Sequence, residues 1–145
     1  MNHSGFTLVE LITTLIIVGI LAAIAAPRFF TQQVYSDRGF YDQTLAITRY
    51  AQKSAIALRR NVCVNIAPPS INLTYASAAG SGSACDTALP SPVGGSPFTI
   101  TGPSGVTLSP STTITFVALG SAGATTTITV SSRTITVESG TGYVH

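Results

Sequence analysis

Glu10 is the residue in this sequence whose charge most needs an explanation. It follows the Gly5-Phe6 junction closely and stands near the start of an otherwise uncharged run that continues to Pro27. An ionised carboxylate in apolar surroundings costs several kcal/mol unless a cation accompanies it. The sequence therefore predicts that Glu10 has a function.

The other ionisable side chains do not form a catalytic set. A hydrolytic triad needs a histidine base, and the two histidines are His3 and His145, the second at a terminus that we expect to be mobile. The remaining acids are scattered along the chain: Asp37, Asp42, Asp86 and Glu138. Gly80-Ser81-Gly82-Ser83 lacks the lysine of a phosphate-binding loop. We therefore expect no enzyme and no cofactor.

Cys63 and Cys85 are the two cysteines of the chain. If the part of the chain that contains them is exported, it meets an oxidising compartment, and a disulfide is favoured. Such a bond would stabilise the fold by about 3 kcal/mol in the chain-entropy model. The alternative is a pair of unrelated buried thiols. A metal site is not expected, since only His3 and His145 could add imidazole ligands.

The element that must position Glu10 is an apolar helix. From Phe6 to Ala26 the apolar residues do not keep to one face, which predicts a helix about 30 Å long that is apolar on all sides and spans a membrane. One alternative is a secretory signal peptide, with Ala22–Ala26 as the cleavage site, and another is a plain signal anchor. A plain signal anchor would explain the hydrophobicity but neither Glu10 nor the Gly-Phe junction.

Composition favours an exported, β-rich domain after this helix. The chain has 145 residues, of which 8% are charged, and its formal net charge is +2. Between Asn61 and Ser132 the one charged side chain is Asp86, so Ser, Thr and Gly must solubilise this part. That pattern does not fit a cytoplasmic enzyme.

A second, amphipathic helix is predicted after Pro27, which should disturb the first. Ser36–Gly39 is expected to interrupt or restart the helix, with Asp37 as an N-cap and Asn61 as a C-cap. The stripe expected to lie on a sheet consists of Phe40, Thr44, Ile47, Ala51, Ala55 and Leu58. The charged residues of the other side are Arg38, Asp42, Arg49, Lys53 and Arg60. They predict a solvated face or, alternatively, a surface that contacts other subunits or an anionic polymer.

After Asn61 the period of the apolar residues changes from 3.6 to 2. The predicted strands are 62–66, 71–75, 98–101, 106–108, 112–118, 124–130 and 133–138, with a hairpin turn at Ser131-Ser132 and a loop from Ala76 to Pro97. Threonine alternates with Ile, Val or Phe, as in antiparallel sheets covered by a helix on one side. The expected fold class is α+β, with a long N-terminal membrane-spanning helix packed on a C-terminal antiparallel β-sheet domain.

At its N-terminus the sequence resembles the type IV pilins and the pseudopilins of type II secretion. Their signature is a short polar leader ending in Gly, then Phe, then an apolar segment whose fifth residue is Glu, which here gives Met1–Gly5, Phe6 and Glu10. The resemblance implies that a prepilin peptidase cuts after Gly5 and methylates Phe6 to N-methylphenylalanine. It also implies that Glu10 faces the N-terminal ammonium of a neighbouring subunit in a filament, and that Pro27 kinks the helix.

The C-terminal part is similar to the GspH/FimT class of minor pilins and minor pseudopilins. The pattern runs from Phe116 and Gly120 through Arg133 to a closing Gly140-x-Gly142-Tyr143-Val144. The segment from Tyr41 to Val64 also looks like minor pilins of the mannose-sensitive haemagglutinin type. These likenesses favour a minor subunit.

The expected organisation is a leader (1–5), a transmembrane or filament-core helix (6–28), an amphipathic helix that continues into the head (29–61) and an antiparallel β-domain (62–145). The resemblance implies a minor type IV pilin or pseudopilin that joins or primes a pilus or a type II secretion pseudopilus. The partners would be other pilin or pseudopilin subunits, the prepilin peptidase and the inner-membrane assembly platform. The chain would cross the inner membrane once, with its C-terminal domain in the periplasm, before entering the filament.

The alternative function is that of a minor pilin that binds DNA during uptake. Such pilins use basic residues near the C-terminus, but Gly140–His145 contains no Lys or Arg. After Arg60 only Arg133 is basic, and phosphate binding draws on several positive charges. Nucleic acid is therefore not expected as a partner.

Gly5→Val should leave the precursor uncut in the membrane, because the peptidase of this family requires a small residue at the last leader position. Ser4→Ala serves as the control and should be processed normally. Mass spectrometry of the wild-type chain should find methylated Phe6 at the N-terminus. A mature chain that begins at any other residue would refute the assignment of the cleavage site.

Overall fold

The computed structural model describes residues 7–80 and 82–145, and for residues 26–32 it describes the backbone alone. The predicted cleavage site between Gly5 and Phe6 lies outside the described residues. The chain is divided between Tyr35 and Ser36 into two compact units, and each is described by itself below.

A single helix, α1, spans Leu8–Leu58 and contains 51 residues. The predicted interruption at Ser36–Gly39, with Asp37 as an N-cap, is wrong, because the helix continues through these residues. None of them is proline, and a glycine inside a helix costs only about 1 kcal/mol relative to alanine. Burial of Phe40 directly afterwards adds tertiary support that local propensity does not include. Pro27 also falls within the bounds of α1, and the kink there stays a prediction.

The C-terminal half of α1 buries the predicted stripe except at its last position. Five of its members are no more than 2% exposed: Phe40, Thr44, Ile47, Ala51 and Ala55. Leu58 is 43% exposed, so its predicted place in the core is wrong. It is the final residue of α1, where the chain turns away from the helix axis.

α1 ends in a turn whose left-handed residue is Arg59, with a φ of 52°. The Arg60 amide donates to the Ala55 carbonyl at 3.2 Å and the Arg59 amide to the Ile56 carbonyl at 3.3 Å, as in a Schellman motif. The prediction of Asn61 as the C-cap is therefore wrong. The prediction relied on residue preference, and a bulky residue such as arginine rarely takes the left-handed conformation.

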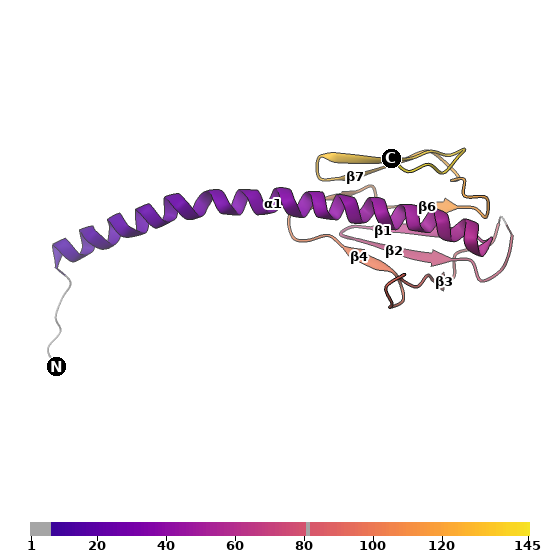
Figure 1. The fold of residues 1–145 in the computed structure, drawn as a ribbon, viewed down its shortest axis with the longest axis horizontal. Helices are drawn as coiled ribbons and strands as arrows, with labels where there is room; N and C mark the ends of the chain where they lie inside the picture. Colours follow the sequence, from indigo (N-terminus) through magenta and orange to yellow (C-terminus); the bar gives the residue numbers. More distant parts are fainter. Residues whose placement is uncertain (1–6, 81) are drawn as a thin grey trace. The chain divides into compact units, whose positions relative to one another are not determined.

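In the described part of the chain, α1 is followed by eight strands in two antiparallel sheets. The strands are β1 (Val62–Ala67), β2 (Ser70–Tyr75), β3 (Thr87–Ala88), β4 (Thr99–Thr101), β5 (Leu108–Ser109), β6 (Thr112–Phe116), β7 (Thr126–Val130) and β8 (Arg133–Val137). The first sheet has the order β3-β2-β1-β6, with β4 also paired to β2, and the second has the order β5-β7-β8. Figure 1 shows the last turns of α1 running alongside these strands.

Each predicted strand has a counterpart, although the ends differ by up to two residues. The turn at Ser131-Ser132 is confirmed and joins β7 to β8, with a φ of 53° at Ser131. The loop predicted from Ala76 to Pro97 is wrong at Thr87–Ala88, which pairs with β2. Two residues are too few for periodicity to reveal a strand, and only the presence of β2 beside them creates one.

α1 and both sheets share one hydrophobic core. Phe116 at the end of β6 is fully buried, as are Ile128 and Ile135, which face each other across β7 and β8. The alternating threonines of these strands are more exposed, since successive side chains point to opposite faces. The predicted α+β class, a long apolar helix followed by a helix packed on antiparallel sheets, is therefore confirmed.

A disulfide joins Cys63 in β1 to Cys85 in the loop before β3, with a Cα–Cα distance of 6.0 Å. The predicted bond is thus confirmed, and the alternative of two free buried thiols is wrong. The bond closes a loop with a sequence separation of 22 residues. It ties this irregular segment, which contains few apolar residues, to a central strand of the first sheet.

Replacing both cysteines, in Cys63→Ser/Cys85→Ser, should lower the free energy of unfolding by about 3 kcal/mol, because the unfolded chain regains the entropy of an open loop. The measurement is urea unfolding of the full chain in detergent. A reductant should destabilise the wild type to a similar degree and leave the double variant unaffected. Alkylation of either cysteine in unreduced wild-type protein would contradict the disulfide.

Candidate functional site

The first functional element is the apolar part of α1, Leu8–Ala25. It contains 18 residues, carries Glu10 as its one charged side chain, and has no side chain buried within the structure. At 1.5 Å per residue it is about 27 Å long, close to the thickness of the hydrocarbon core of a bilayer. A helix that exposes apolar side chains on all sides needs lipid or the apolar helices of other molecules around it.

Thr7 caps the N-terminus of this helix. Its Oγ1 accepts a hydrogen bond from the Glu10 backbone amide at 3.3 Å, which satisfies one of the unpaired amides of the first turn. Thr7 and Glu10 have the spacing of a capping box, in which the glutamate is the third helical residue. Sequence reasoning missed this role, although the Thr-x-x-Glu pattern signals it.

Two further threonines in the apolar part satisfy their hydroxyl groups within the helix. Thr13 Oγ1 donates to the carbonyls of Val9 and Glu10 at 3.0 Å, and Thr14 Oγ1 donates to the carbonyl of Leu11 at 2.9 Å. These hydroxyls need no water, so they are compatible with a hydrocarbon environment. Glu10 is therefore the one group in Leu8–Ala25 whose side chain demands an external partner.

The N-terminal position of Glu10 suits a negative charge, because the helix dipole places positive potential there. The carboxylate is nevertheless exposed, in a segment where the surroundings are expected to be apolar. Gly5 and Phe6 lie outside the described residues, so the pairing of Glu10 with an N-terminal ammonium stays a prediction.

Comparisons with known proteins agree with this geometry. Residues 1–26 match the model of the prokaryotic N-terminal methylation motif. Over 62 residues the chain is 37% identical to the type IV narrow pilus major component PilA5 of Thermus thermophilus. The chain thus carries an N-terminal methylation motif and is similar to a type IV pilus component over 62 residues. The match covers 43% of the chain and 53% of PilA5, so the chain spans about half the length of that relative. No solved structure matches.

The relative named here is a pilus component, which agrees with the expectation that the chain is not an enzyme. Its apolar N-terminal helix fits a membrane-anchored prepilin before pilus assembly. The remaining features of the chain lie in its C-terminal unit, or head, which comprises residues 36–145.

Arg49 fastens the C-terminal segment to α1. Its Nε and Nη2 both donate to the Val144 carbonyl, at 3.1 and 3.0 Å. His145 continues the second sheet by exchanging two backbone hydrogen bonds with Thr136, at 2.7 and 3.0 Å. The prediction of a mobile C-terminus is therefore wrong. No sequence pattern links Arg49 to a residue so distant along the chain.

The charged face predicted on α1 is only partly solvated. Besides Arg49, the guanidinium of Arg60 donates to the carbonyls of Ala76 and Ser77. Arg133 in β8 lies over the ring of Tyr41, with 5.6 Å between its Cζ and the ring centroid. Three of the cations in this head thus have contacts within the fold, and their interpretation as a simple solvated face is wrong for Arg49 and Arg60.

Gln52 holds two loops against α1. Its Nε2 donates to the carbonyls of Gly120 and Thr141, at 3.2 and 3.0 Å. Gly142 has a φ of 65°, and a side chain there would collide with the Gly120 carbonyl. A side chain at Gly120 would likewise collide with Ile56, so Gly120 and Gly142 are both needed for the close approach of these loops to each other and to α1.

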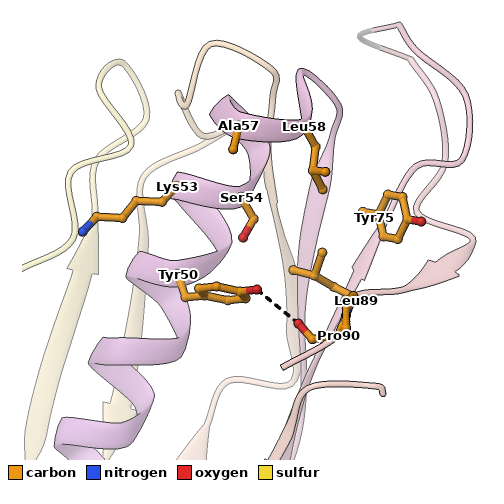
Figure 2. A pocket seen from close by; sticks show the side chains of 8 residues that line it. All are labelled: Tyr50, Lys53, Ser54, Ala57, Leu58, Tyr75, Leu89 and Pro90. Atoms are coloured by element: carbon orange, nitrogen blue, oxygen red, sulfur yellow. Dashed lines mark hydrogen bonds between the residues drawn. The ribbon is translucent and has the colours of Figure 1, made fainter. Parts of the chain in front are cut away.

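On another side of α1 the head has a hollow of about 510 Å³ (Figure 2). The residues that line it are Tyr50, Lys53, Ser54, Ala57, Leu58, Tyr75, Leu89 and Pro90. The Tyr50 hydroxyl donates to the Pro90 carbonyl at 3.2 Å, and its ring packs edge-to-face on Phe98 at 5.4 Å. Sequence analysis gave no sign of this hollow, because its walls come from α1, β2 and the segment after β3.

Asp86 anchors the loop beside the disulfide. Its carboxylate accepts hydrogen bonds from the Ser77 hydroxyl at 2.5 Å, the Ser77 amide at 2.8 Å and the Thr87 hydroxyl at 2.9 Å. These bonds, the Ser77 hydroxyl first, lower the pKa of Asp86 from 3.8 to about 2. Asp86, which in the sequence is one of several acids far apart along the chain, thus has a structural role.

Asp86→Asn should remove a pH-dependent contribution to stability. Since the pKa of the folded state lies below the ordinary value, ionised Asp86 stabilises the fold above about pH 4, and this contribution is lost as the pH falls towards 2. Melting temperatures of the wild type and the variant should therefore differ at pH 6 and converge on acidification. Ser77→Ala should reduce the difference. Curves that stay parallel from pH 6 to pH 2 would contradict this role.

Proposed function

We propose that this chain is a structural subunit of a type IV pilus or of a type II secretion pseudopilus, and that it enters the filament as a minor subunit. Its precursor is cleaved between Gly5 and Phe6, and the new N-terminus is methylated. The observation that carries the proposal is the exposed apolar segment Leu8–Ala25, which bears Glu10 in its first turn and belongs to the same helix as the buried stripe of the head.

This arrangement suits a protein that changes surroundings without refolding. The apolar segment has the length to anchor the subunit in the inner membrane, with the head in the periplasm. The same surface can then pack against the apolar helices of neighbouring subunits after extraction from the membrane. The hydroxyls of Thr13 and Thr14 are bonded within the helix, so neither step leaves them without a partner.

Glu10 supplies the specificity that apolar packing lacks. Apolar helices can slide past one another at little cost, whereas a buried charge is tolerated only opposite a charge of the other sign. Cleavage creates such a charge at the N-terminal amine of Phe6, and a neighbouring subunit would present it to Glu10. The prepilin peptidase and the assembly platform of the inner membrane are the further partners that this proposal requires.

The minor role rests on the similarity of the C-terminal pattern to GspH/FimT-type subunits, and the copy number of the chain in purified filaments tests it. We do not extend the proposal to DNA binding. Arg49 and Arg60 are bonded to backbone carbonyls and Arg133 stacks on Tyr41, so these three cations of the described head are already engaged within the fold.

Glu10→Leu should leave membrane insertion and processing intact but remove the subunit from filaments, because it strands the ammonium of a neighbour. Thr14→Leu is the matched control, since it also replaces a polar side chain of the span with leucine, and it should assemble normally. Glu10→Asp keeps the charge with a shorter reach and should be intermediate. The measurement is the amount of subunit in sheared filaments relative to membranes.

A Glu10→Leu subunit found in filaments at the wild-type ratio would show that the charge pair is not required. Absence of the wild-type chain from both pilus and pseudopilus fractions would overturn the proposed function itself.

A further inference from the structure

The hollow beside α1 contains one buried polar group that the fold does not use. Ser54 lines this hollow and is only 9% exposed. Thr44 and Thr48, the other buried hydroxyl side chains in the head part of α1, donate to carbonyls four residues earlier. Ser54 forms no such bond, and its hydroxyl has no hydrogen-bond partner among the residues that the structure describes. The hydroxyl is therefore available to a molecule that enters the hollow.

The rest of the lining suits an uncharged body. Six of the eight lining residues are apolar or aromatic: Tyr50, Ala57, Leu58, Tyr75, Leu89 and Pro90. The Tyr50 hydroxyl already donates to the Pro90 carbonyl at 3.2 Å. Lys53 is the one cation of the lining, and Figure 2 shows its side chain extending away from Tyr75 and Leu89. An ionised ligand would therefore lose hydration without gaining a counter-charge.

The size of the hollow indicates a small molecule as its occupant. Its volume of about 510 Å³ lies within the range of small-molecule sites, which is about 300–1,000 Å³. Such sites combine mostly apolar walls with a few polar groups that fix the orientation of the ligand. Ser54 supplies a polar group of this kind, and Figure 2 shows its hydroxyl above the Tyr50 ring. A stable contact with another protein would need a much wider surface, of roughly 20–30 residues on each side.

We infer that the hollow binds a small, uncharged molecule with an aromatic or alicyclic body and one hydroxyl or carbonyl group, which forms a hydrogen bond with Ser54 Oγ. The body of the ligand lies against Ala57 and Leu89. Because Ser54 and Ala57 belong to α1 and Leu89 to the segment after β3, the ligand joins the helix to that segment. This inference goes beyond the proposed function and does not depend on it.

The test compares phenol with toluene, which has nearly the same shape but no hydroxyl. The measurement is an NMR titration of the full chain in lipid nanodiscs, in which the methyl signals of Leu89 are followed against the free concentration of the probe. Phenol should bind with a dissociation constant on the order of 1 mM. Ser54→Ala should weaken phenol binding by about five- to tenfold, through the loss of one hydrogen bond, and change toluene binding by less than about twofold.

Two matched variants locate the probe. Ala57→Leu fills part of the hollow and should abolish the binding of both probes. Ala46→Leu makes the same change at an exposed position of α1 outside the lining, and it should bind both probes as the wild type does. Ser54→Ala should not lower the melting temperature of the ligand-free chain, because its hydroxyl has no partner to lose.

Four results would overturn the inference: no saturable shift of the Leu89 signals with phenol, phenol binding that is unchanged in Ser54→Ala, binding that persists in Ala57→Leu, or a lower melting temperature of ligand-free Ser54→Ala. Tighter binding of benzoate than of phenol would also overturn it, because the ligand class would then be anionic. None of these results depends on whether the chain enters filaments, so the proposed function is tested separately.

Discussion

The packing of one narrow stripe of α1 against two sheets is the contact on which the rest of the head depends. Ala51 and Ala55 are completely buried and small, so the helix can approach the strands closely. Thr44 and Thr48 are buried too, but their hydroxyls donate to carbonyls four residues earlier, at 2.8 and 2.7 Å. This buried contact between α1 and the sheets needs no water, and it fixes the rotation of the helix about its axis.

That rotation decides what every other side chain of the helix can do. Arg49 and Gln52 reach the C-terminal loops on one flank, while Tyr50 reaches the segment after β3 on another. The loops contain few apolar residues and short strands, so these side-chain bonds, together with the disulfide, supply order that a small core provides only in part. A change in the stripe would therefore disturb the loops and the hollow at once.

The N-terminal part of α1 follows different physics, because it exposes its apolar side chains instead of burying a stripe. Its stability must come from its surroundings, which on the proposed function are first lipid and then other helices. Charged residues are few in both parts of the chain. The apolar segment has one carboxylate, and in the head Asp86 is the single charged residue between Asn61 and Ser132. A sparsely charged head presents little electrostatic repulsion to neighbours packed around it.

Sequence alone was enough to predict the apolar helix, the buried stripe up to Ala55, the positions of most strands and the disulfide. The helix, the stripe and the strands follow from the local pattern of apolar residues, and the disulfide follows because the chain has only two cysteines. Strand β3 and the ordered C-terminus required tertiary structure, because each is created by partners distant along the chain. The turn at Arg59 is local, and it was missed because arginine rarely takes the left-handed conformation. The hydrogen bonds from Arg49 to the Val144 carbonyl and the hollow also join segments that are distant along the chain, and the walls of the hollow meet only when the strands have paired. Periodicity identifies which face of an element is buried, but only the folded chain determines what that face and its flanks touch.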